Sequence, residues 1–206
     1  MVIGLLSNSA ALAQTQTVVL ARLGMRNAAT SHYLEVIPSY GHWIAPDVYY
    51  FDFGSKKYRE IGAGGGVTGQ LSKRFTATQE LFFDQAYGSS SHGAMFLVPW
   101  SYLGYSITSR IRGETVYFPY FPLNRYGHIE HILERSKVEY YFSHLKLGVG
   151  YGGSKIGDRD WQHKPFLTTT FRGGSWGDLE FWLQRIAGNH LQAQIRYRLL
   201  SRWKKN

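Results

Sequence analysis

Apolar and polar residues alternate along most of this chain with a period of two, which places successive side chains on opposite faces of a β-strand. The alternation is clearest near the C-terminal end, between His190 and Leu199. One face of this segment is apolar and consists of Leu191, Ala193, Ile195, Tyr197 and Leu199, whereas the other is polar and consists of Gln192, Gln194, Arg196 and Arg198. The segment is therefore expected to form a strand between an apolar and an aqueous environment.

The same alternation recurs in several other segments, separated by short breakers or longer polar stretches. These segments are Tyr58–Leu71, Phe75–Tyr87, Lys137–Phe142, His144–Tyr151 and Asp178–Gln184. Long polar connections are expected at Leu123–Arg135 and Gly152–Lys164, and within the first of them Arg125–Arg135 has the three- and four-residue apolar spacing of a helix. The pattern predicts an all-β fold with about ten to twelve antiparallel strands, joined up and down by alternating short turns and longer loops.

Alternation alone does not separate a soluble β-sandwich from a membrane-spanning β-barrel. No stretch of the sequence approaches the ~18 apolar residues that a transmembrane helix needs. Tryptophans near expected strand ends suggest interfacial girdles, and they are Trp43, Trp100, Trp161, Trp176, Trp182 and Trp203. We therefore predict a transmembrane barrel whose polar face lines the lumen, with lumen-facing candidates Glu139, Lys146, Gln192, Gln194, Arg196 and Arg198.

The first residues suggest export. Ala11-Leu12-Ala13 before Gln14 has the small-x-small form of a signal-peptidase site, although no basic region precedes the short apolar stretch. We predict a truncated signal peptide at residues 1–13 and a single barrel domain at 14–206, in the outer membrane. A short apolar tail is the alternative explanation.

The amino-acid composition restricts the classes of binding partner that we expect. The chain has 23 Lys and Arg against 14 Asp and Glu, which gives a formal net charge of +9, and it has no cysteine. This charge would attract membrane lipids and lipopolysaccharide, whereas its scatter in ones and twos disfavours nucleic-acid binding. No cysteine-based metal site or catalytic thiol is available, and we predict no cofactor.

Three motifs could carry chemistry, but none has the context that the chemistry needs. Gly64–Gly69 matches G-x-G-x-x-G without a following helix, so Gly62, Gly64 and Gly66 are better explained by a bend in the wall or a bulky neighbour's close approach. His128 and His131 lack a third metal ligand at a recognisable spacing. Ser143 and His144 are chain neighbours whose side chains would point apart in a strand. We predict no catalytic, cofactor or metal residues.

The pattern from Thr17 to Trp203 resembles the broad class of Gram-negative outer-membrane β-barrel proteins. The alternating strand at Leu191–Leu199 followed by Trp203 is similar to the terminal strand that the outer-membrane assembly machinery recognises in this class, although Lys204, Lys205 and Asn206 follow it. The resemblance implies a structural or porin-like role in small-solute passage, with basic lumen residues favouring anions. The alternatives are a barrel enzyme acting on lipid or lipopolysaccharide through His128, His131 or Ser143, and a soluble exported β-barrel that binds an apolar ligand.

Overall fold

The structure is a computed structural model that describes residues 15–26, 29–54, 58–186 and 190–203. Within these residues it contains twelve strands and one short 3₁₀-helix, Gly174–Trp176. The strands are β1 Thr15–Arg26, β2 Ala29–Tyr40, β3 Trp43–Asp52, β4 Arg59–Gln70, β5 Phe75–Tyr87, β6 Met95–Ser106, β7 Ile111–Pro122, β8 Glu130–Tyr141, β9 Leu145–Ile156, β10 Gln162–Arg172, β11 Asp178–Ile186 and β12 His190–Trp203. The described residues include no helix long and apolar enough to cross a membrane.

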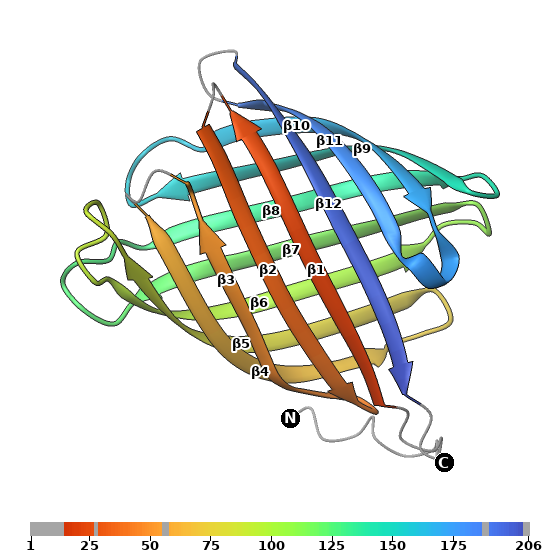
Figure 1. The fold of residues 1–206 in the computed structure, drawn as a ribbon, viewed down its shortest axis with the longest axis horizontal. Helices are drawn as coiled ribbons and strands as arrows, with labels where there is room; N and C mark the ends of the chain where they lie inside the picture. Colours follow the sequence, from red (N-terminus) through yellow and green to blue (C-terminus); the bar gives the residue numbers. More distant parts are fainter. Residues whose placement is uncertain (1–14, 27–28, 55–57, 187–189, 204–206) are drawn as a thin grey trace.

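The strands form a single closed barrel in which each strand is antiparallel to its neighbours in the chain (Figure 1). The ring closes where β1 pairs with β12, with Thr15 opposite Trp203 and Met25 opposite Ala193. Closure pairs the backbone groups of every strand on both sides, so the sheet has no free edge. The predicted all-β, up-and-down barrel is confirmed, with twelve strands at the upper end of the expected range.

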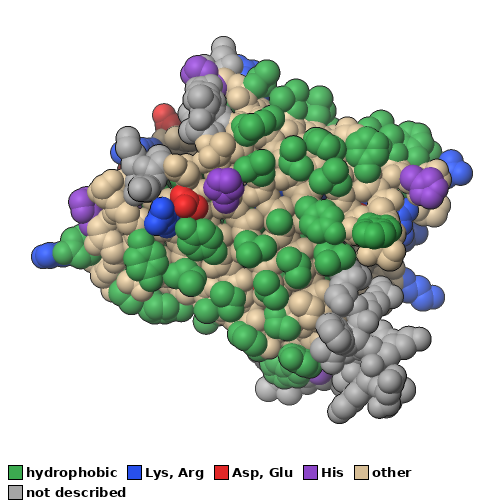
Figure 2. All heavy atoms as spheres, viewed as in Figure 1, with side chains coloured by type: hydrophobic (Ala, Val, Ile, Leu, Met, Phe, Trp, Pro, Cys, Tyr) green, Lys and Arg blue, Asp and Glu red, His purple; other side chains and the backbone are tan. Residues whose placement is uncertain are grey.

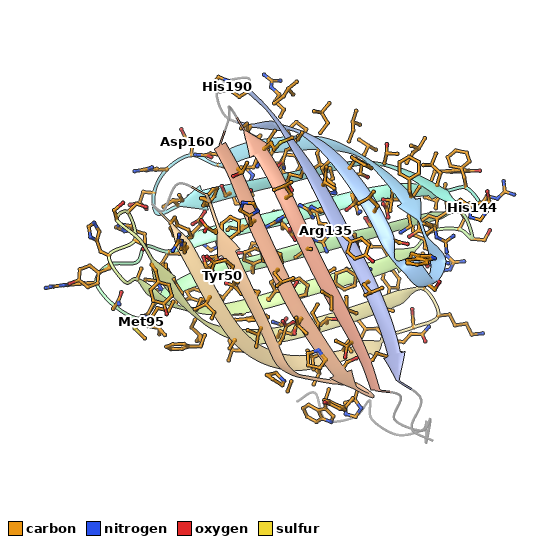
Figure 3. The ribbon with its side chains drawn as sticks, in the orientation of Figure 1. Tyr50, Met95, Arg135, His144, Asp160 and His190 are labelled. Atoms are coloured by element: carbon orange, nitrogen blue, oxygen red, sulfur yellow. The ribbon has the colours of Figure 1, made fainter. Side chains whose placement is uncertain are left out.

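The two ends of the barrel differ in their connections. One end, called here the short-turn end, carries the turns at 41–42, 71–74, 107–110, 142–144 and 173–177. The opposite, long-loop end carries residues 53–54 and 58 and the connections at 88–94, 123–129 and 157–161. His144 and Asp160 mark these two ends in Figure 3. The predicted signal peptide and the connections at 27–28 and 187–189 lie outside the described residues.

The outer surface of the barrel is apolar. Large hydrophobic side chains on every second strand position are exposed, and Val149 and Leu167 keep 61% and 59% of their surface accessible. Figure 2 shows these side chains covering the strands on the viewed face, with Lys and Arg gathered toward the two ends. An apolar belt of this extent on a closed barrel is suited to lipid and argues against the soluble-barrel alternative.

The tryptophan girdle is only partly as expected. Trp43 and Trp176 are exposed at the short-turn end. Trp182 is buried at 2% exposure, and Trp100 packs against the internal hydrophobic cluster. The girdle prediction was wrong for these two because both occupy inward positions of their strands. The side chain of Trp203 lies outside the described residues.

The helix expected at Arg125–Arg135 was also wrong, because β8 begins at Glu130. In the β7–β8 pairing, Val116 lies opposite Arg135 and Tyr117 lies opposite Leu133, so Glu134 is an extra residue in a β-bulge. A bulge shifts the phase of the alternation by one residue, which made the apolar spacing resemble that of a helix. The polar connections there are correspondingly shorter than predicted, and β9 extends to Ile156.

The glycines of β4 allow bulky side chains to approach the wall from inside. A Cβ at Gly62 would collide with Tyr49 and Asp84, and one at Gly64 would lie 2.8 Å from the Phe82 ring. The close approach of a bulky neighbour, one of the two steric explanations offered for these glycines, is therefore what the structure contains.

Candidate functional site: the charged barrel interior

The interior of the barrel carries charged side chains that are largely removed from solvent. Strand positions that alternate with the exterior apolar ones point into the barrel. The buried charged residues at these inward positions include Glu35, Asp47, Glu60, Glu80, Asp84, Lys137 and Glu139. Burying a charge is costly unless it is paired or hydrogen-bonded, so the partners of these groups determine what the interior can do.

A network of ion pairs crosses the lumen at mid-height. It is called here the ion-pair bridge and consists of Arg22, Glu114, Glu134, Arg135, Lys137, Glu180 and Arg196. The contact that joins its two most widely separated strands is between Arg22 Nη1 and Glu134 Oε1, at 2.7 Å. Arg22 lies on β1 and Glu134 on β8, which stand on nearly opposite sides of the ring. Arg135, next to Glu134 in the chain, lies near the middle of the barrel in Figure 3.

Glu134 connects three arginines. It contacts Arg22, Arg135 and also Arg196, whose Nη1 lies 3.3 Å from Glu134 Oε1. Arg135 in turn donates through Nε to Glu114 Oε1 at 2.6 Å. The carboxylate of Glu134 is therefore the junction of the bridge.

Lys137 forms a second junction closer to the short-turn end. Its Nζ lies 2.5 Å from Glu180, 3.0 Å from Glu139 and 3.4 Å from Glu114. The lysine side chain is only 5% exposed. Three carboxylates around one buried ammonium group link β7, β8 and β11 across part of the lumen.

The β-bulge in β8 builds the bridge. Because Glu134 is the extra residue, it and Arg135 both face the interior instead of alternating. Gly152 on β9 accommodates the bulge, since a Cβ there would lie 2.8 Å from the Glu134 carbonyl oxygen. Two adjacent charged residues thus reach the lumen from one strand.

Aromatic side chains support the bridge from the β10–β11 wall. The Arg196 guanidinium lies 3.6 Å from the centre of the Trp182 ring, which stacks on Phe166 with centroids 4.0 Å apart. Cation–π contacts of this kind are strengthened where water is excluded. They hold Arg196 in the orientation that reaches Glu134.

A second polar group, the acid–tyrosine cluster, lies near the long-loop end and consists of Tyr49, Tyr58, Glu60, Asp84 and Tyr120. Glu60 contacts the hydroxyls of all three tyrosines, with Tyr120 donating at 2.8 Å. The Tyr49 hydroxyl also lies 2.5 Å from Asp84 Oδ2. Burial, followed by the Glu60 carboxylate, raises the pKa of Tyr58 above its ordinary value, so its hydroxyl remains a donor. This cluster packs beside the internal hydrophobic cluster around Phe82 and Phe96.

The six lumen candidates from the sequence all lie on the interior face, in different surroundings. Glu139 is buried and bonded to Lys137, and Lys146 pairs with Asp178 at 2.9 Å. Arg196 belongs to the bridge and donates to Gln194 Oε1 at 3.0 Å. Gln192 lies beside Gly24, and Arg198 is opposite Asp178 in the β11–β12 register. Their contribution to solute passage stays a prediction.

Sequence reasoning missed most of the ion-pair bridge. Arg22 and Glu134 are 112 residues apart, and no local pattern links them. The one available signal was the adjacent pair Glu134-Arg135 inside an otherwise alternating segment, which is typical of a bulge.

The residues considered for catalysis are not brought together. Ser143 lies in a turn at the short-turn end, whereas His128 lies in the 123–129 loop at the opposite end. His131 pairs through Nδ1 with the Tyr117 hydroxyl at 2.7 Å in an exposed contact. Among the described residues no group of three or more His, Cys, Asp or Glu has the geometry to hold a metal ion.

These features define a class: a closed twelve-strand barrel with an apolar exterior and a charged interior, which is the fold of outer-membrane β-barrels. Solved structures with the same fold include the KdgM porin in complex with disordered oligogalacturonate, at a TM-score of 0.64 and 10% identity, covering 92% of this chain and 99% of that one. The NanC porin has a TM-score of 0.61 at 10% identity, covering 91% of this chain and 100% of that one. An outer-membrane channel from Pseudomonas putida F1 has a TM-score of 0.64 at 9% identity, covering 94% of this chain and 97% of that one.

No protein-family model matches the sequence, and no curated protein matches it either. The likeness to the solved structures therefore concerns the fold.

Proposed function

We propose that the protein is an outer-membrane channel for small solutes, and that the ion-pair bridge forms the constriction of its lumen. The observation that carries this proposal is the contact between Arg22 and Glu134, which spans the lumen between β1 and β8. Solutes that pass must displace or bypass these side chains, because the bridge occupies the middle of the barrel. The full-length overlap with porins and with an outer-membrane channel supports the same role.

The interior is also divided electrostatically. Strands β2 to β6 contain a single basic residue, Arg59, while the bridge contributes Arg22, Arg135, Lys137 and Arg196 from β1, β8 and β12. Cationic side chains that can contact a passing solute are therefore concentrated on one part of the interior wall, which favours selection by charge as well as by size.

The outer surface of the barrel indicates which molecules it contacts. The apolar belt contacts membrane lipids, basic groups at the barrel ends attract lipopolysaccharide, and the outer-membrane assembly machinery inserts the barrel. By the usual orientation of such barrels, the short-turn end faces the periplasm.

Planar-bilayer recording tests the channel. Glu134→Gln removes the carboxylate at the junction of three arginines, and we expect a larger single-channel conductance than in the wild-type protein. Asp52→Asn is the matched control, because it neutralises a carboxylate whose partner, Arg59, does not reach across the lumen. If neither the wild type nor Glu134→Gln conducts, the proposal is overturned in favour of a packed, non-conducting barrel.

A further inference from the structure

Four basic side chains face the lumen at the short-turn end and are called here the cationic cluster. They are Arg112 on β7, Lys146 on β9, Arg172 on β10 and Arg198 on β12. Three of them surround the ring of Tyr141, at 5.0 Å for Arg112, 5.2 Å for Lys146 and 5.9 Å for Arg172. All three arginines are exposed residues, so the cluster is open to water at the mouth of the barrel.

The strand register shows that the cluster faces inward. Arg172 and Arg198 are both directly opposite Asp178, and opposite residues of antiparallel strands share a face. Asp178 in turn binds the inward-facing Lys146 at 2.9 Å. Arg112 is opposite Glu139, which is buried in the interior.

The cluster has more positive than negative charge. Asp178 is the one carboxylate paired with a member of the cluster in the ion pairs of the described residues, and its partner is Lys146. Glu139 is occupied by Lys137, and Glu114 by Arg135 and Lys137. Arg172 donates to a neutral acceptor, the Ser143 carbonyl oxygen, at 3.3 Å. This differs from the ion-pair bridge, where every cation has a carboxylate partner.

We propose that the cationic cluster is a binding site for a small oxyanion, a phosphate or carboxylate group carried by a solute. Guanidinium groups present paired donors that match the geometry of both oxyanions, and the Tyr141 ring holds the cations close together despite their mutual repulsion. An anion bound there replaces the missing countercharge. The site itself does not need a conducting lumen, although its role as a station for passing solutes rests on the proposed function.

The site coincides in part with what the sequence indicated. Lys146, Arg196 and Arg198 were the basic lumen residues expected to favour anions; Lys146 and Arg198 belong to the cluster, whereas Arg196 is engaged by the bridge and is not part of this site. Arg112 and Arg172 were not singled out in the sequence, because they come from strands that are not consecutive. Closure of the barrel brings both arginines close to the Tyr141 ring.

Equilibrium dialysis of radiolabelled inorganic phosphate against the full-length, detergent-purified barrel tests the site directly. We expect saturable binding by the wild type, and about tenfold weaker binding by the double variant Arg112→Gln/Arg172→Gln, since two charges near the anion are lost. The matched control is Lys73→Gln/Arg74→Gln, which removes two charges from a turn at the same end of the barrel and should bind like the wild type.

A gain-of-binding variant separates loss of the site from loss of folding. Asp178→Asn removes the carboxylate that competes for the cluster, so phosphate should bind more tightly than to the wild type. Acetate in excess should compete with phosphate if the site recognises oxyanions as a class.

Several outcomes would overturn the proposal: no saturable phosphate binding by the wild type, equal losses in the double variant and its control, or weaker binding by Asp178→Asn. Binding without bilayer conductance would retain the site and reject the channel. Conductance without binding would do the reverse.

Discussion

The acid–tyrosine cluster and the ion-pair bridge solve the same problem, buried carboxylates inside a barrel, with different partners. Glu60 is surrounded by three tyrosine hydroxyls, which are neutral donors attached to rigid rings. Glu134 is surrounded by three arginines on long side chains from β1, β8 and β12. The first arrangement lies beside a hydrophobic cluster, and the second joins strands on nearly opposite sides of the ring.

This difference separates a structural wall from a constriction. Rings packed against Phe82 and Phe96 leave little room to rearrange. Ion pairs between flexible side chains can exchange partners with a charged solute or with salt, because Coulomb attraction is available to any ion that enters. We therefore assign stability mainly to the acid–tyrosine cluster and selectivity mainly to the bridge.

The largest effect on stability is expected from Glu60→Ala. It leaves the hydroxyls of Tyr49, Tyr58 and Tyr120 without their shared acceptor, at a cost of about 3 kcal/mol in the free energy of unfolding. Urea unfolding in detergent micelles, followed by heat-modifiable gel migration, measures this. Glu60→Gln, which keeps an acceptor oxygen, should lose less. A loss no greater than that of Asp52→Asn, which neutralises the partner of the 42%-exposed Arg59, would contradict the assignment.

A double-mutant cycle should show the next largest effect, on the contact across the lumen. Arg22→Met and Glu134→Gln, alone and together, should give a coupling energy of about 2 kcal/mol, because the pair is largely removed from water. The pair Arg59 and Asp52, in which the arginine side chain is 42% exposed, provides the comparison and should couple by less than about 1 kcal/mol. Additive effects of the Arg22 and Glu134 variants would show that the contact does not form in solution.

The contrast between the two regions also explains what the sequence could predict. Strand alternation is local, so the barrel class, a range of about ten to twelve strands and the inward position of residues such as Glu139 and Arg196 could be derived from it. Where a bulge shifts the alternation at Glu134, the same reasoning produced a helix that does not exist. Trp182, which points into the barrel, was likewise predicted to belong to an interfacial girdle.

The partners of the charged groups could not be predicted, because they depend on closure. Tyr120 reaches Glu60 from three strands away, and Arg22 reaches Glu134 across the ring. Pairing across a lumen depends on barrel diameter, strand stagger and side-chain length together. None of these can be read from the residues adjacent in the chain.

A smaller loss of stability is expected from adding methyl groups at the glycines that let each region pack. In Gly62→Ala the new methyl would collide with Tyr49 and Asp84, and in Gly150→Ala it would lie 2.5 Å from Phe166. Each should lose about 1–2 kcal/mol of unfolding free energy, since overpacking forces neighbours from their positions. Gly69→Ala is the control, because no atom lies within 4 Å of the added methyl group. Equal urea midpoints for all three variants would mean that neither wall is closely packed.

The smallest effect is expected at the aromatic support of the bridge. Trp182→Phe keeps a ring beneath Arg196 but weakens the cation–π attraction, so it should cost about 1 kcal/mol or less in unfolding free energy. Because Arg196 would then be held less firmly against Glu134, bilayer current through the variant should fluctuate more than through the wild type. Trp43→Phe, on the exposed outer surface, is the control and should change neither quantity. A quiet current in Trp182→Phe would show that Glu134 alone orients Arg196, and the bridge would then depend on its ion pairs without aromatic support.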